Sequence, residues 1–332
     1  MNYWQTNYWL TKVTIGNRSY PRFMGGPLDG YTDSPFRRVV RIFSPENLLY
    51  TQIRHVATLA HAQGSKKSLL FDPIERPLQF QITANSIQGI ELAVQHIQAV
   101  GVDGIDLNIA CPAKNVVKSC SGSAVMANVP LLEQILRLLR ATVNVPLTIK
   151  MRAGFKAKNA LDVVKLAQDC GVDAIAIHPR LQTQKFSGGL DYDLVHDIKK
   201  SVKIPVLYSG GIINFSDAQM VYEHTGADGF LIGRALCGTP WKLAELGAHA
   251  IGKAYTITPE QRVKVAGDHL KFLGEYYGPR GVYHFRKHLP GYIAGFEGAA
   301  GMRKQLMTEQ SAEKVLDGLQ TFLGVSFGEK EK

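Results

Sequence analysis

The sequence predicts an α/β protein, a (β/α)8 TIM barrel with a C-terminal helical domain. Three observations support this fold class: apolar runs alternate with helix-like stretches, eight such runs occur, and the alternation stops near residue 256. Strands that are apolar throughout are typical of parallel sheets covered by helices on both faces. A doubly wound open sheet is the alternative, but eight regular units favour closure into a barrel.

The predicted strands follow one another at regular intervals. They cover residues 21–25, 47–53, 77–82, 104–108, 146–151, 173–178, 204–208 and 228–232. Helical stretches at 87–100, 130–143, 160–170 and 216–225 lie between them. The junctions at 101–104, 171–174 and 226–229 read GVDG, GVDA and GADG, and a glycine there suits the left-handed end of a helix.

The chain divides into three predicted parts. Residues 1–20 form an N-terminal extension, residues 21–250 the barrel, and residues 256–325 a helical domain. The helical domain opens with Thr258 as a cap and Pro259 at the first helical position.

Composition limits the class of protein. No apolar run reaches the roughly 18 residues of a membrane span, and the N-terminus lacks the basic flank and apolar core of a signal peptide. The four cysteines suit neither a disulfide framework nor a zinc site, so we expect no metal, no membrane and a reducing cytoplasm. Lys and Arg total 38 against 28 acidic residues, and this net charge of +10 favours a polyanionic partner such as RNA or DNA.

Polar residues gather at the predicted strand ends, where barrels of this kind carry their chemistry. Ser209, Gly210 and Gly211 follow the seventh strand, and Gly233 and Arg234 follow the eighth. Glycine lets backbone N–H groups approach an anion, so these residues predict a phosphate cradle with a fixed cation. The pattern fits FMN and a sugar phosphate equally.

Lys150 lies within an otherwise apolar predicted strand, where its ammonium needs a partner. A flavin would provide one, because negative charge accumulates near N1 and O2 on reduction. Gln81 is placed to bond the ring edge, and His178 the ring or the ribityl chain. Each of these two residues is equally consistent with an ordinary hydrogen-bonded buried group.

Cys111 follows the fourth predicted strand and precedes a proline, in a polar neighbourhood between Asn108 and Lys114. A thiol near its ordinary pKa of about 8.5 is mostly protonated at neutral pH and can act as a general acid. Free cysteine is often only a small buried hydrophobe, which is our interpretation of Cys170 and Cys237.

Taken together, several segments resemble the dihydrouridine synthase family, most closely its bacterial B-type branch, over residues 17–323. The segments are 26–33 (GPLDGYTD), 106–114 (DLNIACPAK), 150–154 (KMRAG), 178–180 (HPR), 226–228 (GAD), 232–235 (IGRA), 277–279 (YGP) and 286–288 (RKH). The Asn-x-x-Cys-Pro loop is the most specific of them.

The resemblance implies reduction of the uridine C5–C6 bond in tRNA, through FMN with NADPH as the reductant. Hydride would go to C6, and Cys111 would donate the proton to C5. FMN would bind Pro27, Leu28, Asp29, Gln81, Lys150, His178, Ser209, Gly210, Gly211, Gly233 and Arg234. Asn108 would hold the edge of a flipped uracil, and the RNA backbone would contact Arg152, Arg180, Lys185, Arg286 and Lys287. Arg286 and Lys287 also fit a plain solvated helix face.

The sequence departs from the family pattern in four places. It has Gly25-Gly26-Pro27-Leu28 for Ala-Pro-Met, Ser209-Gly210-Gly211 for Asn-Gly-Asp, His178-Pro179-Arg180 for His-Gly-Arg, and Ala110 for a glycine. Glycine at 211 removes a carboxylate that would contact the ribityl chain or the base.

Other functions stay open. The same reaction could act on ribosomal RNA, or a small-molecule reductase of the dihydroorotate or ene-reductase type could use the same flavin site. A phosphate-binding isomerase or aldolase using Lys150, or an RNA-binding protein without catalysis, would also fit parts of the pattern. No Gly-x-Gly-x-x-Gly follows any strand, so no separate dinucleotide domain is predicted, and we expect a monomer.

Overall fold

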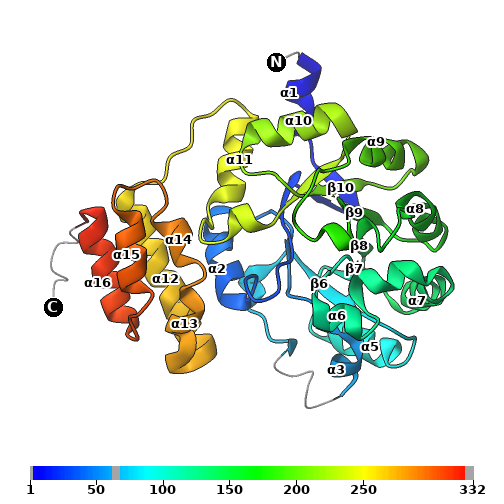
Figure 1. Cartoon of the computed structure of the whole chain (residues 1–332), viewed down its shortest axis with the longest axis horizontal. Coiled ribbons are helices and arrows are strands. Elements are labelled where there is room, and N and C mark those ends of the chain that lie inside the picture. The colour runs from blue at the N-terminus through cyan, green and yellow to red at the C-terminus, as the bar shows by residue number, and fades with distance from the viewer. Residues whose placement is uncertain (1–2, 62–67, 326–332) are drawn as a thin grey trace.

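The computed structural model describes residues 3–61 and 68–325, and a (β/α)8 barrel lies at its centre (Figure 1). The eight parallel barrel strands are β3 (Phe23–Gly25), β4 (Leu49–Tyr50), β6 (Leu78–Thr83), β7 (Gly104–Ile109), β8 (Leu147–Gly154), β9 (Ala174–Leu181), β10 (Val206–Ser209) and β11 (Gly229–Ile232). β11 pairs with β3, and β4 pairs with both β3 and β6, so the sheet closes. The short strand β5 (Arg54–His55) adds to the pairing beside β6. The predicted fold class is confirmed.

Two barrel strands run further than the apolar pattern indicates. β8 ends at Gly154 and β9 at Leu181, each three residues beyond its predicted end. Their pairing continues through Arg152 opposite His178, followed by an irregularity in register before Gly154. Polar residues interrupt the apolar run there, and the extended pair carries these side chains to the mouth of the barrel.

The N-terminal residues close the opposite end of the barrel. Strands β1 (Val13–Ile15) and β2 (Arg18–Tyr20) form an antiparallel hairpin. Val13, Ile15 and Tyr20 pack with the lower barrel residues in a buried apolar cluster. Helix α1 (Tyr3–Leu10) brings Trp9 into stacking with Phe230, 5.4 Å between ring centroids. These residues therefore fill the floor of the barrel.

A ring of helices covers the outside of the barrel (Figure 1). It contains α2 (Ser34–Phe43), α3 (Val56–Ala60), α5 (Ile90–Ala99), α7 (Val129–Thr142), α8 (Ala160–Asp169), α9 (Tyr192–Ser201), α10 (Phe215–Thr225) and α11 (Lys242–Ala250). In α7, Asn128 caps the first turn and Leu132, Ile135, Leu136 and Leu139 repeat at helical spacing on the buried face. The other long helices of the ring also bury their apolar side chains, although α5, α8 and α11 have no side-chain cap.

The C-terminal helices form a separate layer beside the barrel (Figure 1). They are α12 (Pro259–Tyr277), α13 (Gly281–Phe285), α14 (Leu289–Tyr292), α15 (Ala299–Leu306) and α16 (Ala312–Leu323). As the sequence predicts, Thr258 caps α12 and Pro259 is its first residue. The layer packs on α2, where Phe36 stacks on His288 with 4.5 Å between ring centroids.

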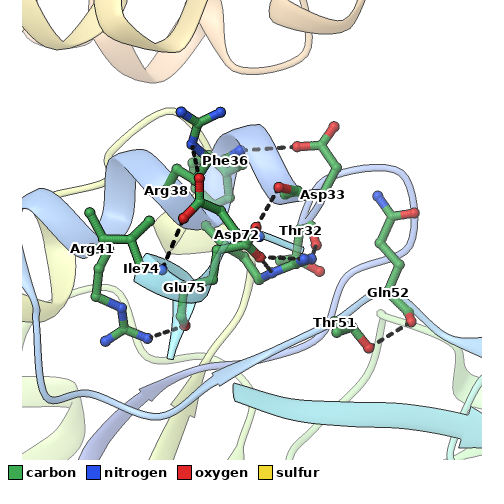
Figure 2. Close-up of polar contacts among 12 residues, drawn as sticks. Thr32, Asp33, Phe36, Arg38, Arg41, Thr51, Gln52, Asp72, Ile74 and Glu75 are labelled. Carbon is green, nitrogen blue, oxygen red and sulfur yellow. Dashed lines mark hydrogen bonds and ion pairs between the residues drawn. The ribbon is translucent and has the colours of Figure 1, made fainter. Parts of the chain in front are cut away.

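Figure 2 shows the polar contacts that hold α2 within the barrel, and Asp33 at the start of α2 also binds the helical layer. Asp33 caps α2 by accepting from the backbone N–H of Phe36, and Arg41 donates to the backbone carbonyl of Glu75. The free oxygen of Asp33 accepts from the hydroxyl of Tyr277 (3.2 Å) and pairs with Lys287 (3.6 Å). Lys287 is thereby held over the mouth of the barrel.

No helix in the described part of the chain combines the length and the apolar character needed to cross a membrane.

Candidate active site

A cavity of about 1110 Å³ opens at the carboxyl ends of the barrel strands. It gathers sixteen of the eighteen residues that the sequence singled out: Pro27, Leu28, Asp29, Gln81, Asn108, Cys111, Lys150, Arg152, His178, Lys185, Ser209, Gly210, Gly211, Gly233, Arg234 and Lys287. Arg180 and Arg286 do not line it. Residues from seven strands and from the helical layer therefore meet around one space.

One side of the cavity is built from backbone. Gly210 and Gly211 follow β10 with φ of +130° and +71°, conformations that favour glycine. A Cβ on Gly210 would lie 3.0 Å from Cδ2 of His178, so a side chain would also push the imidazole. Gly233 follows β11, and Arg234 stands directly after it. Open backbone with one cation beside it is suited to a phosphate.

Two polar groups of the cavity wall, Nζ of the half-buried Lys150 and Nδ1 of the buried His178, have no partner within the described residues. The ammonium of Lys150 has neither a hydrogen bond nor an ion pair, and burial, with the nearby Arg152, lowers its pKa to about 8. Nδ1 of His178 is buried without a hydrogen bond, and burial, with Lys150, lowers the pKa of this imidazole to about 2. His178 is therefore neutral at pH 7. A bound group with acceptors or negative charge would satisfy both.

The loop that carries Cys111 is held by side chains. Oδ1 of Asn108 accepts from the backbone N–H of Cys111 (2.9 Å), and Oγ of Ser123 donates to the Cys111 carbonyl (2.8 Å). Burial raises the pKa of the Cys111 thiol above its ordinary value, although Lys150 and Arg152 act in the opposite direction. The thiol is therefore protonated at neutral pH and able to donate a proton.

Arg152 lines the cavity but is only 2 % exposed. Its guanidinium donates to the carbonyls of Ala110 (2.8 Å), Leu181 (3.0 Å) and Lys185 (2.8 Å). It thus joins the Cys111 loop to the loop after β9. This position suits holding two loops together, whereas the sequence suggested a contact to the RNA backbone.

The remaining predicted cations differ in their surroundings. Arg180 donates twice to the carbonyl of Gly188 within its own loop. Arg286 donates to the carbonyl of Glu309 (3.0 Å) inside the helical layer. Lys185 and Lys287 both line the cavity, Lys185 on the loop after β9 and Lys287 on the helical layer.

The structure adds residues that the sequence reasoning missed. Phe186 is 56 % exposed at the cavity mouth, with its ring centroid 5.5 Å from the guanidinium of Arg234. The signal was available, since this aromatic stands alone in a polar, glycine-rich loop. Asp106 is fully buried beneath the cavity, a charged residue inside an apolar strand as Lys150 is. No group of three or more His, Cys, Asp or Glu side chains in the described ranges is arranged to hold a metal ion.

Fold and cavity together define an enzyme of the TIM-barrel class. The family model "Dihydrouridine synthase" matches residues 24–325, so the chain belongs to this family of flavin-dependent oxidoreductases. It is 30% identical over 315 residues to the "Probable tRNA-dihydrouridine synthase 1" of Synechocystis, with 93% of this chain and 88% of that protein covered. It is 32% identical over 310 residues to the "tRNA-dihydrouridine synthase B" of Pseudomonas aeruginosa, with 92% and 93% covered.

Solved structures agree on the fold. Morphinone reductase superposes with a TM-score of 0.57 at 11% identity, covering 76% of this chain and 91% of its own. The old yellow enzyme homologue from Zymomonas mobilis gives 0.54 at 13% identity, covering 75% and 97%. At such identities the likeness concerns the barrel alone.

Proposed function

We propose that this protein reduces uridine to 5,6-dihydrouridine in tRNA, with FMN as the bound cofactor and NADPH as the reductant. The observation that carries the proposal is the pairing, in one cavity, of a protonated Cys111 with a cationic cradle that lacks a partner. The names of its relatives, tRNA-dihydrouridine synthases covered over about nine tenths of their length, supply the reaction and the RNA.

The cradle fits FMN. Ser209, Gly210, Gly211, Gly233 and Arg234 would hold the phosphate, and Pro27, Leu28, Asp29 and Gln81 would line the remaining wall. Lys150 would face the electron-rich edge of the ring, and Nδ1 of His178 would find a polar partner. When bound, the flavin supplies the hydride that goes to C6 of uracil.

Cys111 would complete the reaction by giving its Sγ proton to C5. The thiol becomes a thiolate, which Lys150 and Arg152 stabilise until it takes a proton from solvent. One hydride and one proton thus add across the C5–C6 bond. Asn108 would bind the uracil edge with the Nδ2 hydrogen that points away from Gln81. The base must leave its stack to reach this position.

The RNA would cross the open end of the barrel between Lys185 and Lys287. In this arrangement residues 21–250 act as the catalytic barrel and residues 256–325 as the RNA-binding helical domain, working as a monomer. The net charge of +10 supports attraction to phosphates. A tRNA substrate would place the protein in the cytoplasm.

The test is an assay with purified protein, FMN, NADPH and an unmodified tRNA transcript, read out as dihydrouridine by nucleoside mass spectrometry. We expect product with tRNA and none with ribosomal RNA fragments, dihydroorotate or an activated alkene. Product from ribosomal RNA alone would reassign the substrate, and turnover of a small molecule alone would favour the ene-reductase type. A colourless protein that FMN cannot reconstitute would contradict the flavin site.

A further inference from the structure

A continuous chain of hydrogen bonds runs from the barrel interior to the Cys111 loop. Thr148 Oγ1 donates to Oδ1 of Asp106 (2.6 Å), and Nε2 of Gln81 donates to its Oδ2 (2.8 Å). Nδ2 of Asn108 donates to Oε1 of Gln81 (3.0 Å). Oδ1 of Asn108 then accepts from the backbone N–H groups of Ala110 (3.0 Å) and Cys111 (2.9 Å).

The direction of every bond in this chain depends on Asp106. An amide side chain has one donor end and one acceptor end and can bind in either orientation, whereas a carboxylate only accepts. Asp106 therefore turns the Nε2 of Gln81 toward itself, which leaves Oε1 for Asn108. Asn108 must then present Nδ2 to Gln81 and Oδ1 to the loop. A reversed Asn108 would place its Nδ2 against two N–H donors and release the loop.

Burial makes the donor and acceptor assignment of these side chains strict. Asp106 is 0 % exposed, Gln81 1 % and Asn108 6 %, so water does not replace a mismatched bond. Asp106 does not line the cavity, whereas Gln81, Asn108 and Cys111 do. Burial raises the pKa of Asp106, whereas the hydrogen bonds from Thr148 and Gln81 and the charge of Lys150, one strand along, act in the opposite direction and favour the carboxylate. A buried carboxylate that accepts two hydrogen bonds is thus connected through two amides to the backbone of the loop that carries Cys111.

We propose that Asp106 is the positioning residue for the catalytic acid: it orients the amides of Gln81 and Asn108 and so fixes the Cys111 loop. The inference rests on the proposed role of Cys111 and assigns Asp106 no contact with substrate or cofactor. Gln81 is accordingly a link between Asp106 and Asn108 as well as a wall of the flavin site.

The donor–acceptor direction of this series of hydrogen bonds can be reversed by exchanging the side chains at positions 106 and 108. In Asn108→Asp, the introduced carboxylate still accepts from the loop but faces Oε1 of Gln81, so two acceptors meet. Adding Asp106→Asn removes the conflict. Gln81 then turns round, accepts from the amide introduced at position 106 and donates to the carboxylate introduced at position 108, while Thr148 still donates to the amide oxygen at position 106. Every donor again has an acceptor, and the net charge equals that of the wild type.

The rate at which iodoacetamide alkylates Cys111 measures how firmly the Cys111 loop is held. The melting temperature of each variant is recorded as well. Trypsin cuts after Lys114, so Cys111 and Cys120 fall in separate peptides for mass spectrometry. Cys120 is exposed and serves as the internal reference. The charge control is Asn108→Asp with Asp162→Asn, because Asp162 lies on α8 and outside the chain of bonds.

We expect Asn108→Asp to raise the alkylation rate of Cys111 about fivefold, the effect of losing one buried hydrogen bond, and to lower the melting temperature. The exchange with Asp106→Asn should restore both to within about twofold of the wild type, and the charge control should not. Equal damage in the exchange variant and in Asn108→Asp alone would overturn the role of Asp106. Alkylation is independent of uridine reduction, so this result stands apart from failure of the proposed reaction.

Discussion

The two sides of the cavity differ in whether their polar groups have hydrogen-bond partners. The cradle side is formed by Lys150, His178, Ser209, Gly210, Gly211, Gly233 and Arg234. Among the described residues, its buried His178 Nδ1 and its half-buried Lys150 ammonium have no partner. On the acid side, formed by Gln81, Asn108, Cys111 and Arg152, the amides, the guanidinium and the backbone of the Cys111 loop bond to one another or to nearby loops. Unsatisfied buried groups cost free energy unless a ligand completes them, whereas satisfied ones hold geometry. The cradle side is thus built to bind and the acid side to position.

The largest effect should come from removing the acid. Cys111→Ala should lower dihydrouridine formation by about 100-fold or more, the usual contribution of a general acid, while FMN binding and NADPH oxidation continue. Cys120→Ala, on the same stretch of chain but exposed, is the matched control and should keep full activity. Equal product from Cys111→Ala would remove this thiol from the mechanism.

The unpartnered imidazole on the cradle side should make the flavin-free protein sensitive to acid. Unfolded histidine titrates near pH 6.5, whereas the pKa of His178 in the fold is about 2. The unfolded state therefore binds more protons below pH 6.5, and the free energy of unfolding falls by about 2 kcal/mol for this histidine between pH 7 and pH 5.

Urea unfolding of the wild type and of His178→Gln at pH 7 and pH 5 measures how much of the loss in unfolding free energy comes from His178. The variant should lose less stability on acidification. His269, whose pKa burial lowers to about 3, is the matched comparison, because His269→Gln should show a similar change away from the cavity. An unchanged pH dependence in His178→Gln would show that its imidazole is not held neutral.

A side chain in the backbone cradle should act on the cofactor and not on the acid. Gly210→Val forces a branched residue to a φ of +130° and against His178, so FMN affinity should fall about tenfold. Gly189→Val, where a Cβ meets nothing within 4 Å, should bind FMN normally. Flavin fluorescence titration measures both. Faster Cys111 alkylation in Gly210→Val would mean that the two sides are not independent.

The smallest effect concerns the RNA. Lys185→Ala should weaken tRNA binding about threefold and reduce the slope of log K against log salt by about one, as for one phosphate contact. Arg286→Ala should lower thermal stability with little change in that slope, since Arg286 bonds to Glu309 within the helical layer. The opposite pattern would exchange the roles of these two cations.

The sequence was sufficient to predict the barrel and to select the residues that line its cavity after β10 and β11, because apolar periodicity and glycines next to strand ends are local signals. It was insufficient for the acid side. Arg152 is buried between two loops because β8 and β9 extend past the apolar run. The hydrogen bond from Gln81 to Asp106 depends on the register in which β6 pairs with β7. Such pairings follow from tertiary register, which residue type and spacing do not encode.

The most direct measurement is a comparison of dihydrouridine in the tRNA and ribosomal RNA of a strain that lacks this protein. The account predicts that at least one tRNA position loses dihydrouridine, that ribosomal RNA is unchanged, and that the wild-type chain restores the tRNA position while Cys111→Ala does not. Unchanged tRNA, or a loss confined to ribosomal RNA, would contradict it.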